Sequence, residues 1–317
     1  MKKDFKPIRL DGIRSYSLEA RRSKVDAVDF GKAYSRSGSF KDFLGALPNI
    51  LAARDLKEIV AEVITACKTH KVIAFGLGAH VIKVGLNPVI IDLMERGVIS
   101  SIALNGAGVI HDSEIAMVGR TSEDVNTGLG EGSFGMAEET AVVINEAIAK
   151  GVKKGLGIGE SVGKRLLELN LPYNDRSILA SGARLNVPVT VHVAIGTDII
   201  HMHPSCDGTA IGAGSHLDFR MFSSIISRLE KGLYLNIGSS VILPEVFLKA
   251  LTLVRNLGYN VVDFTTVNMD FIRHYRPMTN VVNRPTSEGG KGYSIIGHHE
   301  IMVPLLAAAI LEGLVIV

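Results

Sequence analysis

The chain has 317 residues, 47% of them hydrophobic and 21% charged, with a formal net charge of +2. Balanced charge, 6% aromatic residues and the lack of Trp argue against nucleic acid or an anionic membrane as a partner. The two cysteines do not form a disulfide framework, and the polar N-terminus does not resemble a signal peptide. The apolar C-terminal run is short and contains Pro304 and Glu312, so we expect it to form a helix and a strand in the core of a soluble, cytoplasmic protein.

The first predicted elements are an arm and two helices. Residues 1–40 are polar and rich in Arg, Lys and Ser, and we expect them to form an N-terminal arm. The rest of the chain, residues 41–317, is expected to be a single α/β catalytic domain. Apolar residues at helical spacing on both sides of Pro48 predict two helices between residues 39 and 70.

Strands and helices then alternate along the chain. A strand at residues 71–80 is followed by a helix that Gly97 closes, and by a second strand that ends in glycines. Further apolar strands are predicted at residues 187–204, 232–243 and 258–268, with helices between them and an elaborated crossover at 113–185. This alternation predicts a Rossmann-like, doubly wound parallel sheet.

Four of the predicted strands end in small residues. These ends are Gly76 to Ala79, Asn105 to Gly108, Gly238 to Ser240, and Thr265 with Thr266. The carboxyl ends of parallel strands meet at one crevice, where glycines let a ligand approach the backbone. The set therefore favours a bound nucleotide, while the alternative is that the glycines only close tight turns.

The histidines at residues 201 and 203 permit three interpretations. Placed two apart on a strand, His201 and His203 would point to one face and could hold zinc with Cys206 or Asp207. Alternatively, Asp207 and Gly208 lie at a strand end and hydrogen-bond a ligand, or the histidines belong to a packed turn. The nearby glycine-rich stretch KKGLGIGESVGKRLLE at 153–168 fits neither the dinucleotide nor the phosphate-loop template.

Lys291 and His111 are the candidates for chemistry. Lys291 lies in a predicted glycine-rich loop, where a dry pocket would make it an imine-forming nucleophile, although such lysines are more often solvated charges. His111 and Asp112 are predicted in the first turn of a helix, with Asp112 as an N-terminal charge and His111 as an acid or base. His298 and His299 follow a strand and could meet a ligand or cap the next helix.

The order of these motifs resembles that of deoxyhypusine synthases. The resemblance runs from about residue 28 to 312 and is carried by GLGAHVIKVGLNPVIIDLMERGVISSIALNGAGVIHD, HPSCDGT, LYLNIGSSVIL, GYNVVDFTTVN, GGK and IIGHHEIMVPLLAAAIL. It implies a Rossmann-like fold, bound NAD, and a homotetramer with active sites at subunit interfaces. It also implies a transferase that oxidises a spermidine-like polyamine to an imine and passes the fragment through a lysine to a protein lysine acceptor.

The resemblance also assigns residues. Lys291 takes the place of the imine-forming lysine. The residues implied to border NAD are Gly76, Gly78, Ala79, His80, Asn105, Gly106, Gly108, Asp207, Gly238, Ser239, Ser240, Thr265, Thr266 and His298. Ile110 and His111 replace two glutamates of the family, and Leu243 and Pro244 stand where it has a substrate histidine, which indicates a changed substrate.

Three function classes follow. The leading hypothesis is a deoxyhypusine synthase-like, NAD-dependent enzyme acting on an amine or amino acid, either through Lys291 or through hydride transfer alone. The second is a zinc hydrolase built on His201 and His203. The third is a non-catalytic NAD-binding protein.

Overall fold

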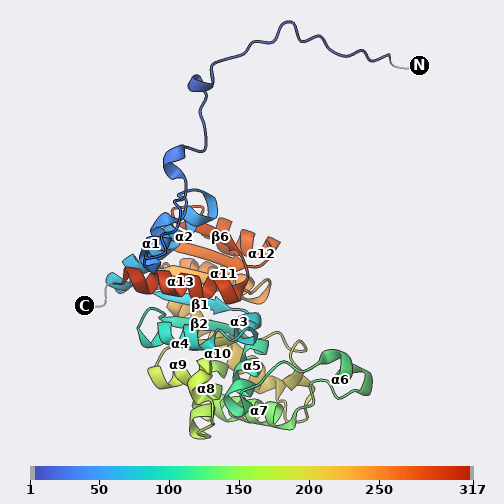
Figure 1. Cartoon of the computed structure of the whole chain (residues 1–317). Coiled ribbons are helices and arrows are strands. Elements are labelled where there is room, and N and C mark those ends of the chain that lie inside the picture. The colour runs from blue at the N-terminus through green and yellow to red at the C-terminus, as the bar shows by residue number, and fades with distance from the viewer. Residues whose placement is uncertain (1–3, 315–317) are drawn as a thin grey trace. The chain divides into compact units, whose positions relative to one another are not determined.

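The structure is a computed structural model that describes residues 4–314 (Figure 1). The chain divides into two units between Leu51 and Ala52, whereas the sequence analysis placed the end of the arm at residue 40. In the first unit, residues 4–28 are all exposed, and the only elements described are η1 (Leu18–Ala20), η2 (Ala27–Asp29) and α1 (Phe40–Ala46). Ser39 and Asp42 cap α1 reciprocally.

The second unit is built on one six-stranded parallel sheet. Its strands are β1 (Ile73–Leu77), β2 (Ser101–Asn105), β3 (Val189–His192), β4 (Leu233–Ile237), β5 (Thr265–Asp270) and β6 (Lys291–Ile296). The strand order is β3-β2-β1-β4-β5-β6, so the order reverses between β1 and β4. This arrangement confirms the Rossmann-like, doubly wound fold.

Helices connect these strands and cover both faces of the sheet (Figure 1). The α-helices of this unit are α2 (Leu51–Lys68, which begins at the unit boundary), α3 (Ala79–Lys83), α4 (Asn87–Glu95), α5 (Gly106–Val118), α6 (Val125–Glu131), α7 (Glu138–Val152), α8 (Ile158–Glu168), α9 (Ile178–Leu185), α10 (Gly208–Ile226), α11 (Ile242–Asn256), α12 (Tyr275–Pro277) and α13 (His299–Gly313). The shorter segments are η3 (Asn174–Arg176), η4 (Ile199–Met202) and the π-helical η5 (Met278–Asn283). Within residues 4–314, no helix is both long and apolar enough to cross a membrane.

The core has two parts, because successive strand residues point to opposite faces of the sheet. Phe75 and Leu235 belong to one cluster, which also holds buried side chains of α2, α4, α5, α7, α8, α9 and α13. Tyr234 belongs to the other, which packs against α10 and α11. Its ring stacks on that of Phe247 at 4.0 Å between centroids. Both faces of the sheet are therefore covered, and ligands can reach it only at the strand ends.

Several predicted boundaries are corrected. The predicted helix at 81–97 is two helices, α3 and α4, separated at Gly85, whose φ is +78°. The strand predicted at 187–204 stops at His192. The two helices flanking Pro48 are confirmed as α1 and α2. The C-terminal run, expected to be a helix and a strand, is helical to Gly313, and residues 315–317 lie outside the described part.

Candidate functional site

The carboxyl ends of the strands form the candidate site. At the point where the strand order reverses, the backbones of β1, β4 and β5 approach closely: Gly78 N donates to Ile237 O at 2.8 Å, and Gly238 N donates to Met269 O at 2.9 Å. In open α/β sheets, ligands bind outside the carboxyl ends of the strands at such a reversal. The loops after β1, β2, β4 and β6 meet this edge.

Most of the residues expected to border NAD lie in the loops and helix starts at this edge. They are Gly78, Ala79, His80, Asn105, Gly106, Gly108, Asp207, Gly238, Ser239, Ser240 and His298. Asp207 is exposed and caps α10, because its Oδ1 accepts from Thr209 N and Ala210 N. Ser239 Oγ accepts from Leu243 N and so helps to begin α11.

Two of the predicted glycines are required by packing inside the protein. Gly76 lies within β1, and a Cβ there would come 2.4 Å from the hydroxyl of Tyr234. A Cβ on Gly78 would come 2.0 Å from the carbonyl oxygen of Gly238. These contacts explain the small residues without a ligand, so the glycines alone do not establish a nucleotide site.

The carboxyl group of Asp198, which was not identified from the sequence, lies at the start of α5. Asn105 caps this helix by accepting from Gly108 N at 3.0 Å. A Cβ on Gly106 would lie 1.9 Å from Asp198 Oδ2. Asp198 is buried, which raises the pKa of its carboxyl group, and its Oδ2 has no hydrogen-bond partner among the described residues. The sequence signal was weak, since Asp198 stands in a loop 92 residues after Gly106.

A cluster of aromatic and histidine rings lies beside the end of β5. The ring of His80 is 5.8 Å from that of Phe271 and 5.6 Å from that of His299, while His298 stacks on Phe271 at 6.3 Å. His299 Nε2 lies 3.9 Å from a carboxylate oxygen of Asp270. Burial lowers the pKa of His299. His80 and His298 are both exposed, so a ligand can reach either ring, and a general acid or base needs such access. Of the two, His80 is the one whose ring lies against that of His299.

A cavity of about 390 Å³ opens at the carboxyl end of β3, between α10 and α11. Apolar side chains dominate its wall, with His192, Ser215, His216 and Glu245 as the polar members. Burial lowers the pKa of His192 to about 3, so this ring is neutral near pH 7. The volume lies within the range of small-molecule sites, about 300–1,000 Å³.

Three predicted site residues lie at the amino ends of the strands, on the opposite side of the sheet from the candidate site. Thr265 and Thr266 begin β5 and Lys291 begins β6, so the prediction that the threonines end a strand is wrong. The side chain of Lys291 is 60% exposed and pairs with Glu62, which raises the pKa of the lysine. This is the reverse of the dry pocket and lowered pKa that imine chemistry needs.

His111 and Asp112 are not in the first turn of their helix, because α5 begins at Gly106. Asp112 is buried and accepts from Ile178 N and Leu179 N, so it caps α9 rather than α5. His111 Nδ1 lies 2.6 Å from Thr121 Oγ1, which in turn donates to Glu114. The histidine therefore ties the loop after α5 to that helix.

His201 and His203 do not share a strand face. His201 lies in η4, and its Nδ1 accepts from Gly196 N. His203 Nε2 lies 3.1 Å from a carboxylate oxygen of Glu138. Among residues 4–314, no group of three or more His, Cys, Asp or Glu side chains is placed to hold a metal ion, so the structure gives the zinc hydrolase no support.

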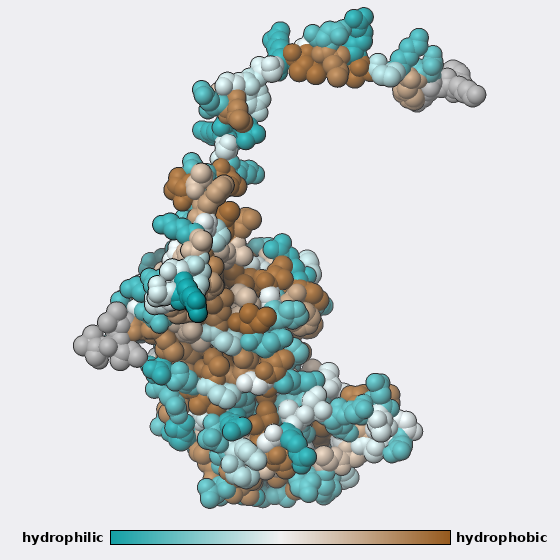
Figure 2. Space-filling view, in the orientation of Figure 1, coloured by the Kyte–Doolittle hydropathy of each residue, from teal (hydrophilic) through white to brown (hydrophobic). Residues whose placement is uncertain are grey.

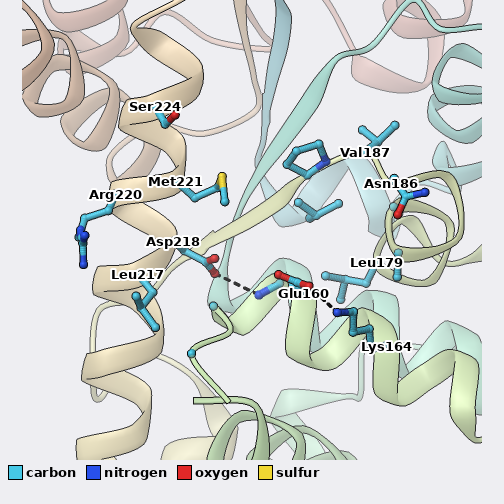
Figure 3. Close-up of a pocket in the computed structure, with 17 residues that line it drawn as sticks. Glu160, Lys164, Leu179, Asn186, Val187, Leu217, Asp218, Arg220, Met221 and Ser224 are labelled. Atoms are coloured by element: carbon cyan, nitrogen blue, oxygen red, sulfur yellow. Dashed lines mark hydrogen bonds and ion pairs between the residues drawn. The ribbon is translucent and has the colours of Figure 1, made fainter. Parts of the chain in front are cut away.

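A second cavity, of about 510 Å³, lies away from this edge, beside the start of β3 (Figure 3). The glycine-rich stretch that fitted no nucleotide template lines it. Asp218 points from α10 toward the start of α8 and accepts from Gly159 N and Val191 N, whereas Arg220 points away from it. Cβ atoms on Gly157 and Gly159 would come 1.8 Å from Asp218 Oδ1 and Val189 O. These glycines thus serve close packing.

Comparison with known proteins supports the fold. A conserved LOR/SDH protein from Methanococcus maripaludis S2 is 17% identical with a TM-score of 0.53, and the match covers 82% of this chain and 69% of that one. The AgrE ternary complex with ornithine and NAD+ is 15% identical (TM-score 0.52), with 82% and 33% covered. A protein assigned as a deoxyhypusine synthase from Entamoeba histolytica is 13% identical (TM-score 0.50), with 88% and 95% covered.

The chain therefore spans about a third of AgrE and most of the other two proteins. No protein-family model and no curated protein matches it. At these identities the similarity establishes a shared Rossmann-like fold, and AgrE is a protein with this fold that has been solved with NAD+.

Proposed function

We propose that the chain is an NAD-dependent enzyme that oxidises and then re-reduces an amine or amino acid at the carboxyl edge of its sheet. One observation carries this proposal. The reversal of strand order between β1 and β4 coincides with an accessible histidine, His80, packed on the Asp270–His299 pair. A crevice where a ligand can approach the backbone, with a general acid or base beside it, suits transient hydride transfer.

The residues at this edge fit a dinucleotide. The cavity of about 390 Å³ beside His192 offers apolar walls to a heteroaromatic base. The start of α11 would direct first-turn backbone N–H groups toward a phosphate, whereas the Asn105 cap and the Asp198 carboxyl group occupy the start of α5. When bound, NAD would supply the hydride acceptor, while the chain's own residues orient the substrate and move its proton.

The substrate class rests on similarity and on the charge of the site. AgrE has been solved with ornithine and NAD+, and one similar fold is assigned to a deoxyhypusine synthase. The acidic group that Asp270 contributes beside His299 suits an amine. We propose hydride transfer without a lysine imine, since Lys291 lies at the other edge of the sheet and pairs with Glu62.

The homotetramer that the family resemblance implies is part of this proposal. Exposed apolar side chains follow the carboxyl ends of four strands: Ile195 after β3, Val241 after β4, Phe271 and Ile272 after β5, and Ile301 after β6. Another copy of the chain that covered them would also enclose the site. A protein lysine acceptor has no comparable support.

The test begins with calorimetric titration of nucleotide-stripped protein with NAD. We expect one site per chain at micromolar affinity. Ornithine and spermidine are then mixed with the NAD complex while NADH absorbance is followed. No binding up to millimolar NAD would remove the proposal, and binding without turnover of any amine or amino acid would leave a non-catalytic NAD-binding protein.

Variants then separate the two chemistries. His80→Asn should lower turnover about 100-fold or more, because general acid–base catalysis is worth about 10²–10⁴. His70→Asn, an exposed histidine before β1, is the matched control and should leave turnover unchanged. Lys291→Ala should also retain turnover, and its inactivity would restore the imine mechanism.

A further inference from the structure

The two edge strands of the sheet, β3 and β6, are protected to different degrees. On β3, side chains of α10 bond to the outer backbone groups. Asp218 accepts from Val191 N, while Ser215 Oγ accepts from the N–H of residue 193 and donates to Val191 O. All four residues of β3 are buried, whereas three of the six residues of β6 are exposed. One edge is therefore closed by the chain itself, and the other is accessible.

The accessible edge carries unpaired backbone groups. Lys291 N donates to Phe264 O at 3.0 Å, so the residues at odd positions of β6 bond to β5. Residues that face one neighbour alternate along a parallel strand with residues that face away, and the latter are Gly292, Ser294 and Ile296. Within residues 4–314, no hydrogen bond is formed to the N–H or C=O groups of these three residues. Such a row of free groups is a template for pairing with another strand.

Two side chains on this edge also lack partners. The Oγ atom of Ser294 is buried and forms no hydrogen bond within the part of the chain that the structure describes. A buried hydroxyl group in that state is unfavourable and usually has a partner. The side chain of Ile296 is 53% exposed, and it lies on the same face of the strand as Ser294.

The edge is complementary to itself. When a second β6 runs antiparallel with a two-fold axis at Ser294, this residue faces Ser294 of the other copy, and Gly292 faces Ile296 in both directions. Each of these three pairs then exchanges two backbone hydrogen bonds. The serine hydroxyl groups meet and can bond to each other, while each isoleucine lies over a glycine, which has no side chain to obstruct it.

The geometry points to the free edge of β6 as an interface between two copies of this chain, which join by antiparallel pairing of their β6 strands. Lysine on an edge strand commonly opposes such pairing, but the charge of Lys291 is paired with Glu62 of its own chain. The interface requires neither NAD nor the chemistry of the carboxyl edge.

This interface differs from the apolar surface at the carboxyl ends of the strands. It runs along the side of the sheet, so one copy of the chain cannot cover both surfaces. A tetramer with D2 symmetry needs different two-fold interfaces on each subunit, and β6 pairing supplies one of them.

The experiment is sedimentation velocity of the nucleotide-stripped full chain and its variants. The wild type should form a dimer or a larger even-numbered assembly. Ser294→Pro removes an N–H that has no partner in the chain, and proline is tolerated on edge strands, so the protein should fold while its mass halves. Ile296→Lys places a charge over the second β6 strand and should also halve the mass.

Val118→Lys is the matched control. Val118 is an exposed apolar residue, 54% exposed, at the end of α5, which follows β2 near the other end of the sheet. This variant should keep the wild-type mass. Thermal unfolding of each variant detects misfolding, and Ile296→Lys decides the test if Ser294→Pro does not fold.

Hydrogen exchange resolved to single residues reports the register. In the assembly, the amides of Gly292, Ser294 and Ile296 should be as protected as that of Ile295, which bonds to β5. In Ile296→Lys, protection should persist at residue 295 and be lost at residues 292 and 294, because only the latter bond across the interface.

The outcomes separate this inference from the proposed function. A wild type that is monomeric at micromolar concentration, or folded variants of both β6 positions that keep the wild-type mass, would overturn the β6 interface. Fast exchange at residues 292 and 294 in an assembled wild type would do the same. Neither result affects NAD binding, which the calorimetric titration measures separately.

Discussion

Asp218 shows how one buried carboxyl group closes the edge of the sheet. β3 is an edge strand, and Asp218 accepts from its Val191 N at 2.9 Å and from Gly159 N at 3.0 Å. Burial outweighs these bonds and raises the pKa of Asp218 from 3.8 to about 7. The residue therefore serves the fold, and it leaves a signature in the pH dependence of stability.

That signature has a definite sign. Between about pH 4 and 7 the folded state holds a proton on Asp218 that the unfolded state has released, so this residue's contribution to stability falls as pH rises. Asp218→Asn lacks the effect. Relative to the wild type, its free energy of unfolding should rise by on the order of 2–4 kcal/mol from pH 4 to pH 8.

Urea denaturation at several pH values measures this difference. Exposed Asp175→Asn serves as the control for removing one carboxylate, and its difference from the wild type should change little over the same range. A difference for Asp218→Asn that stays flat from pH 4 to pH 8 would contradict the raised pKa.

Single residues also show the limit of reading a sequence. The glycines after the strands lie at the candidate edge, as predicted. The packing contacts that require a glycine there could not be predicted from the neighbouring residues. Gly78 is small because Gly238 approaches it, and Gly106 because Asp198 does. Such contacts join residues that are far apart in sequence, so a single chain without its fold cannot reveal them.

At the scale of elements, α9 depends on an acid carried by another helix. Asp112 of α5 accepts from Ile178 N, Leu179 N, Ser177 Oγ and Asn87 Nδ2, all at 3.0 Å or less. Asp112→Ala would leave these buried donors unpaired. We expect it to lower the free energy of unfolding by about 3–5 kcal/mol.

Chemical denaturation gives the size of that loss, and hydrogen exchange locates it. Exchange should accelerate at the amides of Ile178 and Leu179. Asp207→Ala removes a solvent-exposed cap from α10 and should cost only about 1 kcal/mol. Equal losses in the two variants would show that burial of the cap is unimportant.

The boundaries of β5 illustrate which elements were predictable. The apolar run before Thr265 suggested a strand that ends at the threonines. In the structure, Glu230 accepts from Val262 N and Asp263 N, which keeps these residues out of the sheet. Pairing begins only where Leu233 of β4 meets Thr265. The apolar run located the strand, but pairing with β4 determines where it begins. The position of Lys291 at the start of β6 could not be predicted either, because it depends on how β6 pairs with β5.

At the scale of the whole molecule, the N-terminal segment, residues 4–28, exposes all of its side chains. Figure 2 shows hydrophobic surface along this segment. Phe5, Ile8 and Val28 are each more than 80% exposed. Because residues 4–28 are all exposed, deleting residues 1–28 should leave the melting temperature within about 2 °C of the wild type.

Circular dichroism of the shortened chain checks this expectation, and gel filtration of both chains compares their assembly. A clearly lower melting temperature would show that the segment packs on the folded chain or on a second copy. An unchanged melting temperature with a smaller assembly would assign these apolar side chains to contacts between copies.

The overall architecture was predictable in class but not in order. Alternating strands and helices indicated a parallel sheet covered on both faces, and the structure confirms it. The reversal between β1 and β4 depends on which strands pair, and Ala74 pairs with Ser101 as well as with Tyr234. No local pattern distinguishes a near partner from a distant one.

The same reversal has a consequence for how the chain folds. β1, β2 and β3 precede β4 and can pair as they leave the ribosome, but Ile73 meets Leu233 only after another 160 residues have been made. Loop closure over that distance is costly and slow, so the centre of the sheet should be completed late in folding. The crevice between β1 and β4 exists only after that step, and the recovery of ligand binding during refolding would therefore time the last stage of assembly rather than the first.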